Sequence, residues 1–384
     1  MRSLWIIVGV IVIVAAIFVS IRFTQKPGLQ ERVIKIGAVL PLTGNLAVIG
    51  EQEKAAILLA QKTVKGAAKV KVYIQDNKGD PKEAVTIVNR LHSFEGVKIF
   101  LISPSPAILA TIPIILNFDG ILFAITSMPD IGDGKNVFHI SPNSKDEMIQ
   151  LAEWLDSQKI HEIAFIYPNN DLGQIIYKTF LSKFRGHLVF SESYQVGSKD
   201  FRDILTKLKD LAGKLEWISF QGYPGDIPIF IKQAREMGIK SKFITSMATT
   251  WPETVKVLTL MRESPIFMAP SCMIESLQSP NARKFVELFV AETKIPPNWD
   301  AYYTFEVMRI IGQFATLQTW SIPELRVYLL NKTHEGITGK IRINLKGEIE
   351  VPLVAATLQD GRIVLWGGNK YETTHGSSHK IDVQ

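Results

Sequence analysis

The chain has 384 residues, of which 46% are hydrophobic and 21% charged, a composition that excludes a disordered protein and predicts about two globular domains. The net charge is +6, but the basic residues are spread along the chain, so no nucleic-acid partner is predicted. The single cysteine, Cys272, excludes an intramolecular disulfide and a cysteine-based metal site, and its apolar surroundings predict a buried hydrophobic residue.

The N-terminal segment contains an apolar run from Leu4 to Ile21 without a charge. This run is about long enough for a helix to span a bilayer. Because no small-residue cleavage site follows at a suitable spacing, we interpret residues 1–23 as an uncleaved membrane anchor, with a cleaved signal peptide as the alternative. Residues 24–32 are expected to form a linker to the soluble body.

From Val33 onward, apolar strand-like runs alternate with segments of helical periodicity. This alternation predicts an α/β protein with parallel sheets built from βαβ units. Asp80, Pro81 and Glu83 predict a helix start, as N-cap, first helical residue and capping-box acid. The predicted strands are VIKIGAVL (33–40), KVKVYIQD (69–76), KIFLIS (98–103), GILFAIT (120–126), EIAFIYP (162–168), HLVFSESY (187–194), EWISFQGY (216–223) and KFITSM (242–247).

The C-terminal part has a different pattern. Residues 336–366 predict hairpins with turns at Lys346-Gly347 and Asp360-Gly361. Residues 371–384 are polar and are expected to form a loose tail.

Small polar or aromatic residues follow several predicted strands, at the edge where open parallel sheets bind ligands. They are found at 103–106, 126–127, 169–171 and 222–223. Each group alone is typical of a helix cap, and Ser105 is expected to cap a helix that begins at Pro106. Together, the groups indicate a binding site.

Sequence motifs of common enzyme classes are absent. The chain has no G-x-S-x-G elbow, phosphate-binding loop, H-E-x-x-H or G-x-G-x-x-G motif. We therefore predict a protein that is not an enzyme, with no cofactor and no metal.

The order of the motifs resembles the branched-chain-amino-acid class of substrate-binding proteins of ABC transporters, which have the type I periplasmic-binding fold. The similarity runs from about Val33 to Trp366. The segments that carry it are IKIGAVLPLTGNLAVIGEQ (34–52), QDNKGDPKEAV (75–85), FIYPNNDLGQ (165–174), ESYQVGSKDFRDILTKLK (192–209), GYPGDIPIFIKQAREMGIK (222–240), AYYTFEVMRII (301–311) and GITGKIRINLKGEI (336–349).

The resemblance implies two Rossmann-like lobes that are joined by three crossover strands and close on a ligand held between them. It places the body outside the cytoplasm, anchored to the cytoplasmic membrane. Lobe 1 is expected at 33–141 and 271–338, and lobe 2 at 142–270 and 339–370. The crossovers are expected near Ser141-Pro142, Ala269-Pro270 and Thr338-Gly339.

The resemblance also implies a set of ligand-binding residues. Hydroxyl groups and backbone N–H groups of lobe 1 bind the carboxylate of an amino acid in this family, and Pro129 lacks the donor that a threonine supplies there. Tyr223 matches the family, whereas two positions that are aromatic in the family are aliphatic in this chain. The expected residues are Ser103, Ser105, Thr126 and Ser127 for the carboxylate, and Ile49, Leu172 and Tyr223 around the ligand body.

Met247 occupies the position of the family's ammonium-binding acid, and methionine supplies no counter-charge. One interpretation is a ligand without an ammonium group, such as a carboxylic acid or an amide. A second is that another acid, Asp300 or Asp226, replaces the missing one. A third is that the chain no longer binds small ligands.

The function implied by the resemblance is capture of a small ligand and its delivery to an ABC permease. The alternative is a ligand-sensing or regulatory ectodomain on the same fold, which signals to a partner rather than feeding a transporter.

Overall fold

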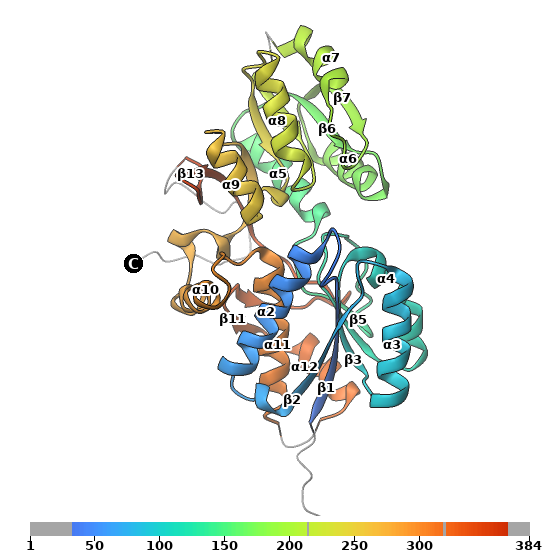
Figure 1. The fold of residues 1–384 in the computed structure, drawn as a ribbon. Coiled ribbons are helices and arrows are strands. Elements are labelled where there is room, and N and C mark those ends of the chain that lie inside the picture. Colours follow the sequence, from blue (N-terminus) through green and yellow to red (C-terminus); the bar gives the residue numbers. More distant parts are fainter. Residues whose placement is uncertain (1–32, 213–214, 318–319, 368–384) are drawn as a thin grey trace, which may run out of the picture.

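The structure, a computed structural model, describes residues 33–212, 215–317 and 320–367. The predicted membrane anchor, the linker and the loose C-terminal tail lie outside these residues. Within the described ranges, no helix has the length and apolar character needed to cross a membrane. The described residues form two α/β lobes stacked end to end (Figure 1), which confirms the predicted pair of lobes with parallel sheets but not the predicted transmembrane helix.

The first lobe is built on a five-stranded parallel sheet in the order β2-β1-β3-β4-β5. Its central strands are buried on both faces, as their near-continuous apolar sequences predict. The strands are β1 (Ile34–Leu40), β2 (Val70–Asp76), β3 (Ile99–Ile102), β4 (Ile121–Ala124) and β5 (Val137–His139).

Helices cover both faces of this sheet. Residues of α3 and α4 pack with Phe100 and Leu122 on one face, and residues of α2 and α11 pack with Ile36 and Leu101 on the other. The helical elements are α2 (Ala47–Thr63), η1 (Ala67–Lys69), α3 (Pro81–Glu95), α4 (Ser105–Asn117), η3 (Ser271–Met273), η4 (Glu275–Leu277), α10 (Pro280–Thr293), α11 (Trp299–Phe314) and α12 (Ile322–Asn331).

The second lobe is built on a seven-stranded sheet in the order β14-β13-β10-β9-β8-β6-β7. The sheet is parallel except for β13, which runs antiparallel to both of its neighbours. The strands are β6 (Glu162–Pro168), β7 (His187–Tyr194), β8 (Trp217–Phe220), β9 (Lys242–Thr245), β10 (Ile266–Pro270), β13 (Leu353–Gln359) and β14 (Arg362–Leu365).

The helices of the second lobe follow its strands in βαβ order. The helical elements are α5 (Ser144–Ser157), α6 (Asp171–Lys183), α7 (Arg202–Ala212), α8 (Asp226–Glu236), η2 (Met247–Thr250) and α9 (Pro252–Leu260).

Two local sequence signals gave correct predictions. Asp80 is the N-cap of α3, its side chain accepts a hydrogen bond from the Lys82 amide at 2.7 Å, and Pro81 is the first helical residue. The Asp360-Gly361 turn joins β13 to β14, and both residues have positive φ angles, 49° and 76°, as a tight hairpin turn requires.

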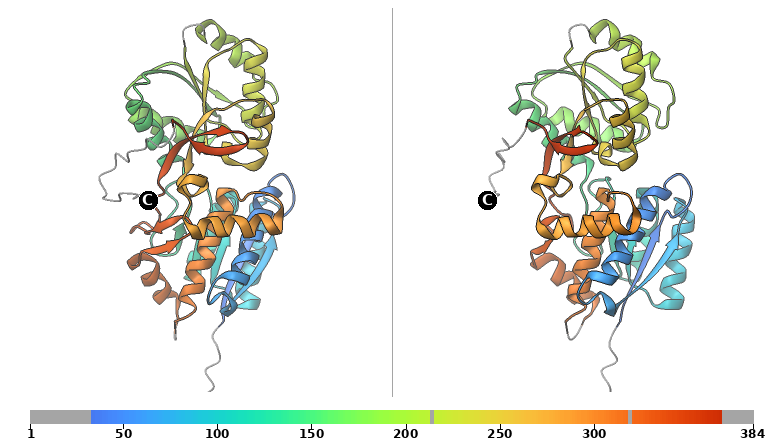
Figure 2. Two further views of the ribbon diagram at one scale, coloured as in Figure 1. Left: turned by 90° about the vertical axis from the view of Figure 1, so that its left-hand side faces the viewer. Right: turned by 60° about the vertical axis from the view of Figure 1, so that its left-hand side comes forward.

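The chain passes between the lobes three times (Figure 2). The first crossover follows β5 and the second follows β10. The third comes after Glu348, because Glu348 still bridges to His139 of β5, and the Ile349 amide donates to the His139 carbonyl at 3.2 Å. The hairpin of β11 (His334–Gly336) and β12 (Gly339–Ile341) therefore stays with the first lobe, and this crossover lies later than the predicted Thr338-Gly339 junction.

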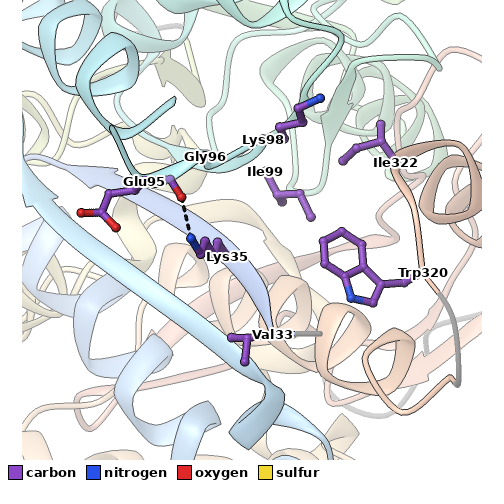
Figure 3. Close-up of a pocket in the computed structure, with 8 residues that line it drawn as sticks. All are labelled: Val33, Lys35, Glu95, Gly96, Lys98, Ile99, Trp320 and Ile322. Atoms are coloured by element: carbon purple, nitrogen blue, oxygen red, sulfur yellow. Dashed lines mark hydrogen bonds between the residues drawn. The ribbon is translucent and has the colours of Figure 1, made fainter. Parts of the chain in front are cut away.

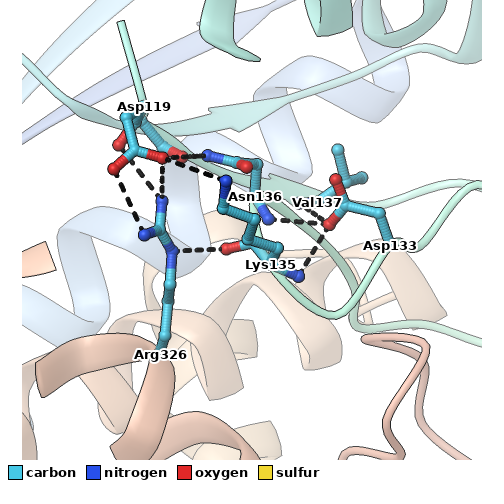
Figure 4. Close-up of polar contacts among 7 residues, drawn as sticks. Asp119, Asp133, Lys135, Asn136, Val137 and Arg326 are labelled. Atoms are coloured by element: carbon cyan, nitrogen blue, oxygen red, sulfur yellow. Dashed lines mark hydrogen bonds and ion pairs between the residues drawn. The ribbon is translucent and has the colours of Figure 1, made fainter. Parts of the chain in front are cut away.

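An arginine fixes α12 to the edge of the first sheet (Figure 4). The Arg326 guanidinium donates to Asp119 Oδ1 at 2.7 Å and to the Lys135 carbonyl at 2.6 Å. The hydrogen bonds that Asp119 accepts from Arg326 and then from Asn136 hold the pKa of Asp119 below its usual range. The ion pair thus joins α12 to the connection between α4 and β4, and the bond to Lys135 joins it to the connection between β4 and β5.

Candidate functional site

The corner after β1 is fixed to the end of the neighbouring strand. Asp76, the last residue of β2, accepts hydrogen bonds from the Leu42 amide at 2.9 Å and from the Thr43 hydroxyl at 2.6 Å. A Cβ atom on Gly50 would lie 2.3 Å from the Pro41 carbonyl oxygen, so only glycine lets α2 approach the corner this closely. Ile49, half-buried, lies in this first turn of α2.

Hydroxyl groups gather at the carboxyl ends of β3 and β4. Ser105 Oγ and Thr126 Oγ1 are 2.5 Å apart, and Thr126 Oγ1 also accepts a hydrogen bond from the Met128 amide. Ser127 is half-buried beside them. Ser105 and Thr126 therefore contact each other where β3 and β4 end, with Ser127 next along the chain. These strand ends form the edge of the first sheet that faces the second lobe (Figure 1).

The prediction that Ser105 caps the following helix is wrong. Helix α4 begins at Ser105 itself, its N-cap position is Pro104, and no side chain caps it. The Ser105 hydroxyl instead contacts Thr126 of the neighbouring loop. A capping role therefore does not explain why a serine stands at position 105.

Ser103 and Asp300 belong to a buried polar cluster beneath these hydroxyls. The Ser103 hydroxyl donates to Glu53 Oε2 at 2.5 Å, and Asp300 Oδ2 accepts from Asn298 Nδ2 at 2.9 Å. Burial raises the pKa of Asp300 to about 8, and burial followed by the Asp300 charge raises that of Glu53. The side chains of Ser103 and Asp300 thus point to partners inside the first lobe.

The edge of the second lobe carries Tyr223, Leu172 and Met247. The half-buried Tyr223 accepts a hydrogen bond from Asn170 Nδ2 at 3.1 Å, and Leu172 lies in the first turn of α6 beside this contact. Met247 is the first residue of η2, which follows β9 after Ser246, and Met247 is only 3% exposed. All three follow strands of the second sheet, as predicted for the edge that binds ligands.

Asp226, one of the two proposed replacement acids, forms hydrogen bonds with residues of a neighbouring turn. Its Oδ2 accepts from the Tyr194 hydroxyl at 3.0 Å and from the Gly197 amide at 3.3 Å. The carboxylate thereby fixes the turn after β7 to the start of α8.

A carboxylate that was not predicted from the sequence lies beside Met247. Glu147 of α5 is 3% exposed, and its Oε1 accepts a hydrogen bond from the Met247 amide at 2.5 Å. Burial raises the pKa of Glu147 to about 8, against the lowering effect of that amide. A sequence signal was present, because Glu147 lies four and eight residues before Leu151 and Leu155, on the buried face of the helix.

A short connection joins the hydroxyl-rich edge to Glu147. The Ser144 amide, at the start of α5, donates to the Ser127 carbonyl at 2.9 Å. Helix α5 begins at the first crossover, so its first turn contacts one lobe with Ser144 and the other with Glu147. The candidate site therefore spans both lobes.

A pocket of about 180 Å³ lies elsewhere, at the amino ends of β1 and β3 (Figure 3). Lys35, Lys98 and Trp320 are among its lining residues. Its volume is below the roughly 300–1,000 Å³ of typical small-molecule sites, and it lies at the sheet edge opposite to the hydroxyl groups. We therefore do not assign the ligand site to it.

The described ranges contain no group of three or more His, Cys, Asp or Glu side chains that could hold a metal ion. Cys272 is free and buried, and burial raises the pKa of its thiol. A neutral, enclosed thiol is a poor nucleophile.

Comparison with known proteins identifies the family. Residues 33–316 match the sequence profile of a family described as periplasmic binding protein. The chain is 24% identical over 221 residues to the Leu/Ile/Val-binding protein homolog 3 of Brucella melitensis, covering 54% of this chain and 59% of that protein. It is 22% identical to a leucine-, isoleucine-, valine-, threonine- and alanine-binding protein of Pseudomonas aeruginosa, covering 83% and 87%.

A solved structure has the same fold. The branched-chain amino acid transporter substrate binding protein LivJ from Streptococcus pneumoniae, in complex with isoleucine, superposes with a TM-score of 0.76 at 21% identity, covering 86% of this chain and 97% of that one. Because the family profile covers most of the described residues, the relationship extends beyond fold. The chain belongs to the periplasmic binding protein family.

Proposed function

We propose that this protein is an extracytoplasmic solute-binding protein that captures a small ligand between its lobes and delivers it to an ABC permease. The observation that carries the proposal is that the first turn of α5 connects the hydroxyl-rich edge of the first lobe, through the Ser127 carbonyl, to the buried Glu147 that accepts from the Met247 amide of the second lobe. Family membership and relatives named for branched-chain amino acids support the same conclusion.

We assign the ligand carboxylate to Ser105, Thr126 and Ser127 of the first lobe. Ile49, Leu172, Tyr223 and Met247 are assigned to the ligand body, because they supply apolar or aromatic surface at the same edges. Ser103 and Asp300 are assigned a supporting role, because they interact with the buried Glu53 and not directly with the ligand. A ligand that contacts both lobes stabilises the closed arrangement, and the closed arrangement is the form that a permease recognises.

Ser105→Ala is expected to weaken ligand binding by about 10- to 100-fold, because a hydrogen bond to a charged group is worth about 1.5–3 kcal/mol. The measurement is isothermal titration calorimetry of the full-length chain in detergent with L-leucine, L-isoleucine and L-valine. Ser182→Ala is the control, because Ser182 is an exposed serine on α6 whose hydroxyl bonds only to the Thr179 carbonyl. Equal affinities of the two variants would contradict the assignment of Ser105.

Binding is proposed to occur without chemical change of the ligand. Ligand recovered after prolonged incubation with the protein is therefore expected to be unaltered by mass spectrometry. A time-dependent product would contradict this part of the proposal.

We further propose that the apolar segment from Leu4 to Ile21 anchors the protein to the cytoplasmic membrane, on the strength of its length and lack of charge. The full-length chain is then expected to float with membranes in a density gradient after a high-salt wash. A chain without residues 1–23 is expected to stay in the soluble fraction. Recovery of the full-length chain in the soluble fraction would contradict the anchor.

A further inference from the structure

Glu147 is a buried carboxylate with half of its hydrogen-bonding capacity unused. Its Oε1 accepts from the Met247 amide, and its Oε2 accepts no hydrogen bond from the described residues. No charged side chain contributes to the shift of its pKa, whose causes are burial and that amide alone. A carboxylate this enclosed is costly to ionise unless a positive group pairs with it.

Other buried carboxylates near the two lobe edges already have side-chain partners. Glu306 pairs with the charged Arg309. The other three accept hydrogen bonds from neutral side chains, Glu53 from Ser103, Asp300 from Asn298 and Asp226 from Tyr194, and Glu53 Oε1 has no partner among the described residues. Glu147 differs because its one partner is a backbone amide. That amide belongs to Met247, the residue at the position that the resemblance assigns to the ammonium-binding acid, so Glu147 is the buried acid that adjoins this position.

The position of Glu147 relative to the hydroxyl groups fits one class of ligand. The first turn of α5 connects it to Ser127, through the hydrogen bond from Ser144 to the Ser127 carbonyl. In an α-amino acid, the ammonium and carboxylate groups are attached to the same carbon atom. A site for such a ligand needs an acid and a set of hydroxyl donors near each other, and the first turn of α5 links the segment that carries Glu147 to the loop of Ser127 across the crossover.

We propose that Glu147 binds the ammonium group of the ligand, and that the ligand is an α-amino acid although Met247 lacks a counter-charge. This inference rests on the proposed solute-binding function and names its ligand class. It also places the replacement acid on α5 and not at Asp300 or Asp226.

The test compares amino acids with their counterparts that lack the amino group. The full-length protein in detergent is titrated with L-leucine, L-isoleucine and L-valine, and with 4-methylpentanoate, 3-methylpentanoate and 3-methylbutanoate. The wild type is expected to prefer the amino acids. Glu147→Gln is expected to weaken amino-acid binding by at least about 100-fold, because it removes one partner of a buried charge pair. It keeps an oxygen for the Met247 amide, so the fold is retained.

Asp146→Asn is the matched control. Asp146 is the preceding residue of the same helix turn, but its side chain accepts from Asn143 Nδ2 at 2.9 Å, whereas the Met247 amide donates to Glu147. Its replacement is expected to leave amino-acid affinity within about twofold of the wild type.

Proton release gives a second readout that a structural role of Glu147 would not produce. Because the pKa of Glu147 is about 8, the carboxyl group of the free protein is mostly protonated at pH 7. Pairing with an ammonium group favours the ionised form, so binding is expected to release close to one proton per ligand. Titrations in buffers of different ionisation enthalpy measure this number, and Glu147→Gln is expected to abolish the release.

The outcomes separate the inference from the function on which it rests. Binding of amino acids with unchanged affinity in Glu147→Gln, or a loss in Asp300→Asn alone, would overturn the role of Glu147 and leave the solute-binding function intact. Preferential binding of the three carboxylates would overturn the ligand class. Binding of none of the six compounds would contradict both the inference and the proposed function.

Discussion

Glu306→Gln is expected to lower the free energy of unfolding by about 3–5 kcal/mol, because it breaks a buried ion pair and leaves its partner unpaired. Glu306 is fully buried in α11, and its Oε2 accepts from Arg309 Nε at 2.5 Å. Its Oε1 accepts from the amide and hydroxyl of Thr338, at 2.8 and 3.1 Å. One carboxylate therefore neutralises an enclosed arginine and fixes the β11–β12 hairpin just before the third crossover.

Urea unfolding followed by circular dichroism measures this effect. Glu275→Gln is the control, because Glu275 and Arg362 form an ion pair of 3.7 Å with side chains that are 73% and 74% exposed. An exposed pair of this kind contributes no more than about 1 kcal/mol. Similar losses in the two variants would show that burial of Glu306 does not have the energetic role described here.

Gly173→Ala is the second substitution for which we expect a large effect. A Cβ atom at this position would lie 1.8 Å from the carbonyl oxygen of Pro168, and backbone atoms at that distance cannot move aside without displacing β6 or α6. We expect the free energy of unfolding to fall by about 3 kcal/mol or more. Because Leu172 and the Asn170 contact with Tyr223 lie at the same corner, ligand affinity is expected to fall as well.

Gly225→Ala is the appropriate comparison for Gly173→Ala. Gly225 precedes α8 and has a helical backbone conformation, and a Cβ atom added to it would have no heavy atom within 4 Å. Its replacement is expected to change the free energy of unfolding by less than about 1 kcal/mol. If Gly173→Ala proved equally mild, the close approach of α6 to the end of β6 would not be a constraint on the fold.

A glycine allows close packing of a helix against the preceding strand end in both lobes. Gly50 lets α2 approach Pro41 after β1, and Gly173 lets α6 approach Pro168 after β6. In each case, the helix thereby begins close against the end of the preceding strand, at the edge that carries the candidate ligand contacts. The glycines at these corners are best explained by close backbone packing that positions the site.

Much of the architecture could be predicted because its signals are local. The start of α3 at Pro81 follows from an aspartate N-cap and a proline, and the turn between β13 and β14 follows from Asp360-Gly361. The alternation of apolar strands and helices predicted the parallel sheets, since strands covered on both faces are apolar throughout.

Features that depend on tertiary contacts could not be predicted in this way. The third crossover lies beyond Glu348 because His139, about two hundred residues earlier in the chain, holds the intervening segment against β5. Ser105 looked like a helix cap, but its hydroxyl contacts Thr126 of another loop. No local pattern reports either contact.

The candidate site also depends on a tertiary contact that local sequence patterns do not predict. The lack of charge at Met247 could be predicted, but the sequence left three interpretations open, and the one with a replacement acid named Asp300 or Asp226. Glu147 precedes Met247 by one hundred residues, and only the packing of α5 against the end of β9 brings its carboxylate to the Met247 amide. Its charge on the buried face of α5 was the one signal that the sequence offered.

The measurement that tests the central claim most directly is thermal unfolding of the full-length protein in the presence of each of the twenty common amino acids at millimolar concentration. A ligand that binds only the folded protein raises the unfolding midpoint by mass action. We predict that at least one amino acid raises the midpoint by several degrees, and that its counterpart without the amino group does not. A midpoint that no amino acid changes would contradict the proposal that this protein binds an α-amino acid between its lobes.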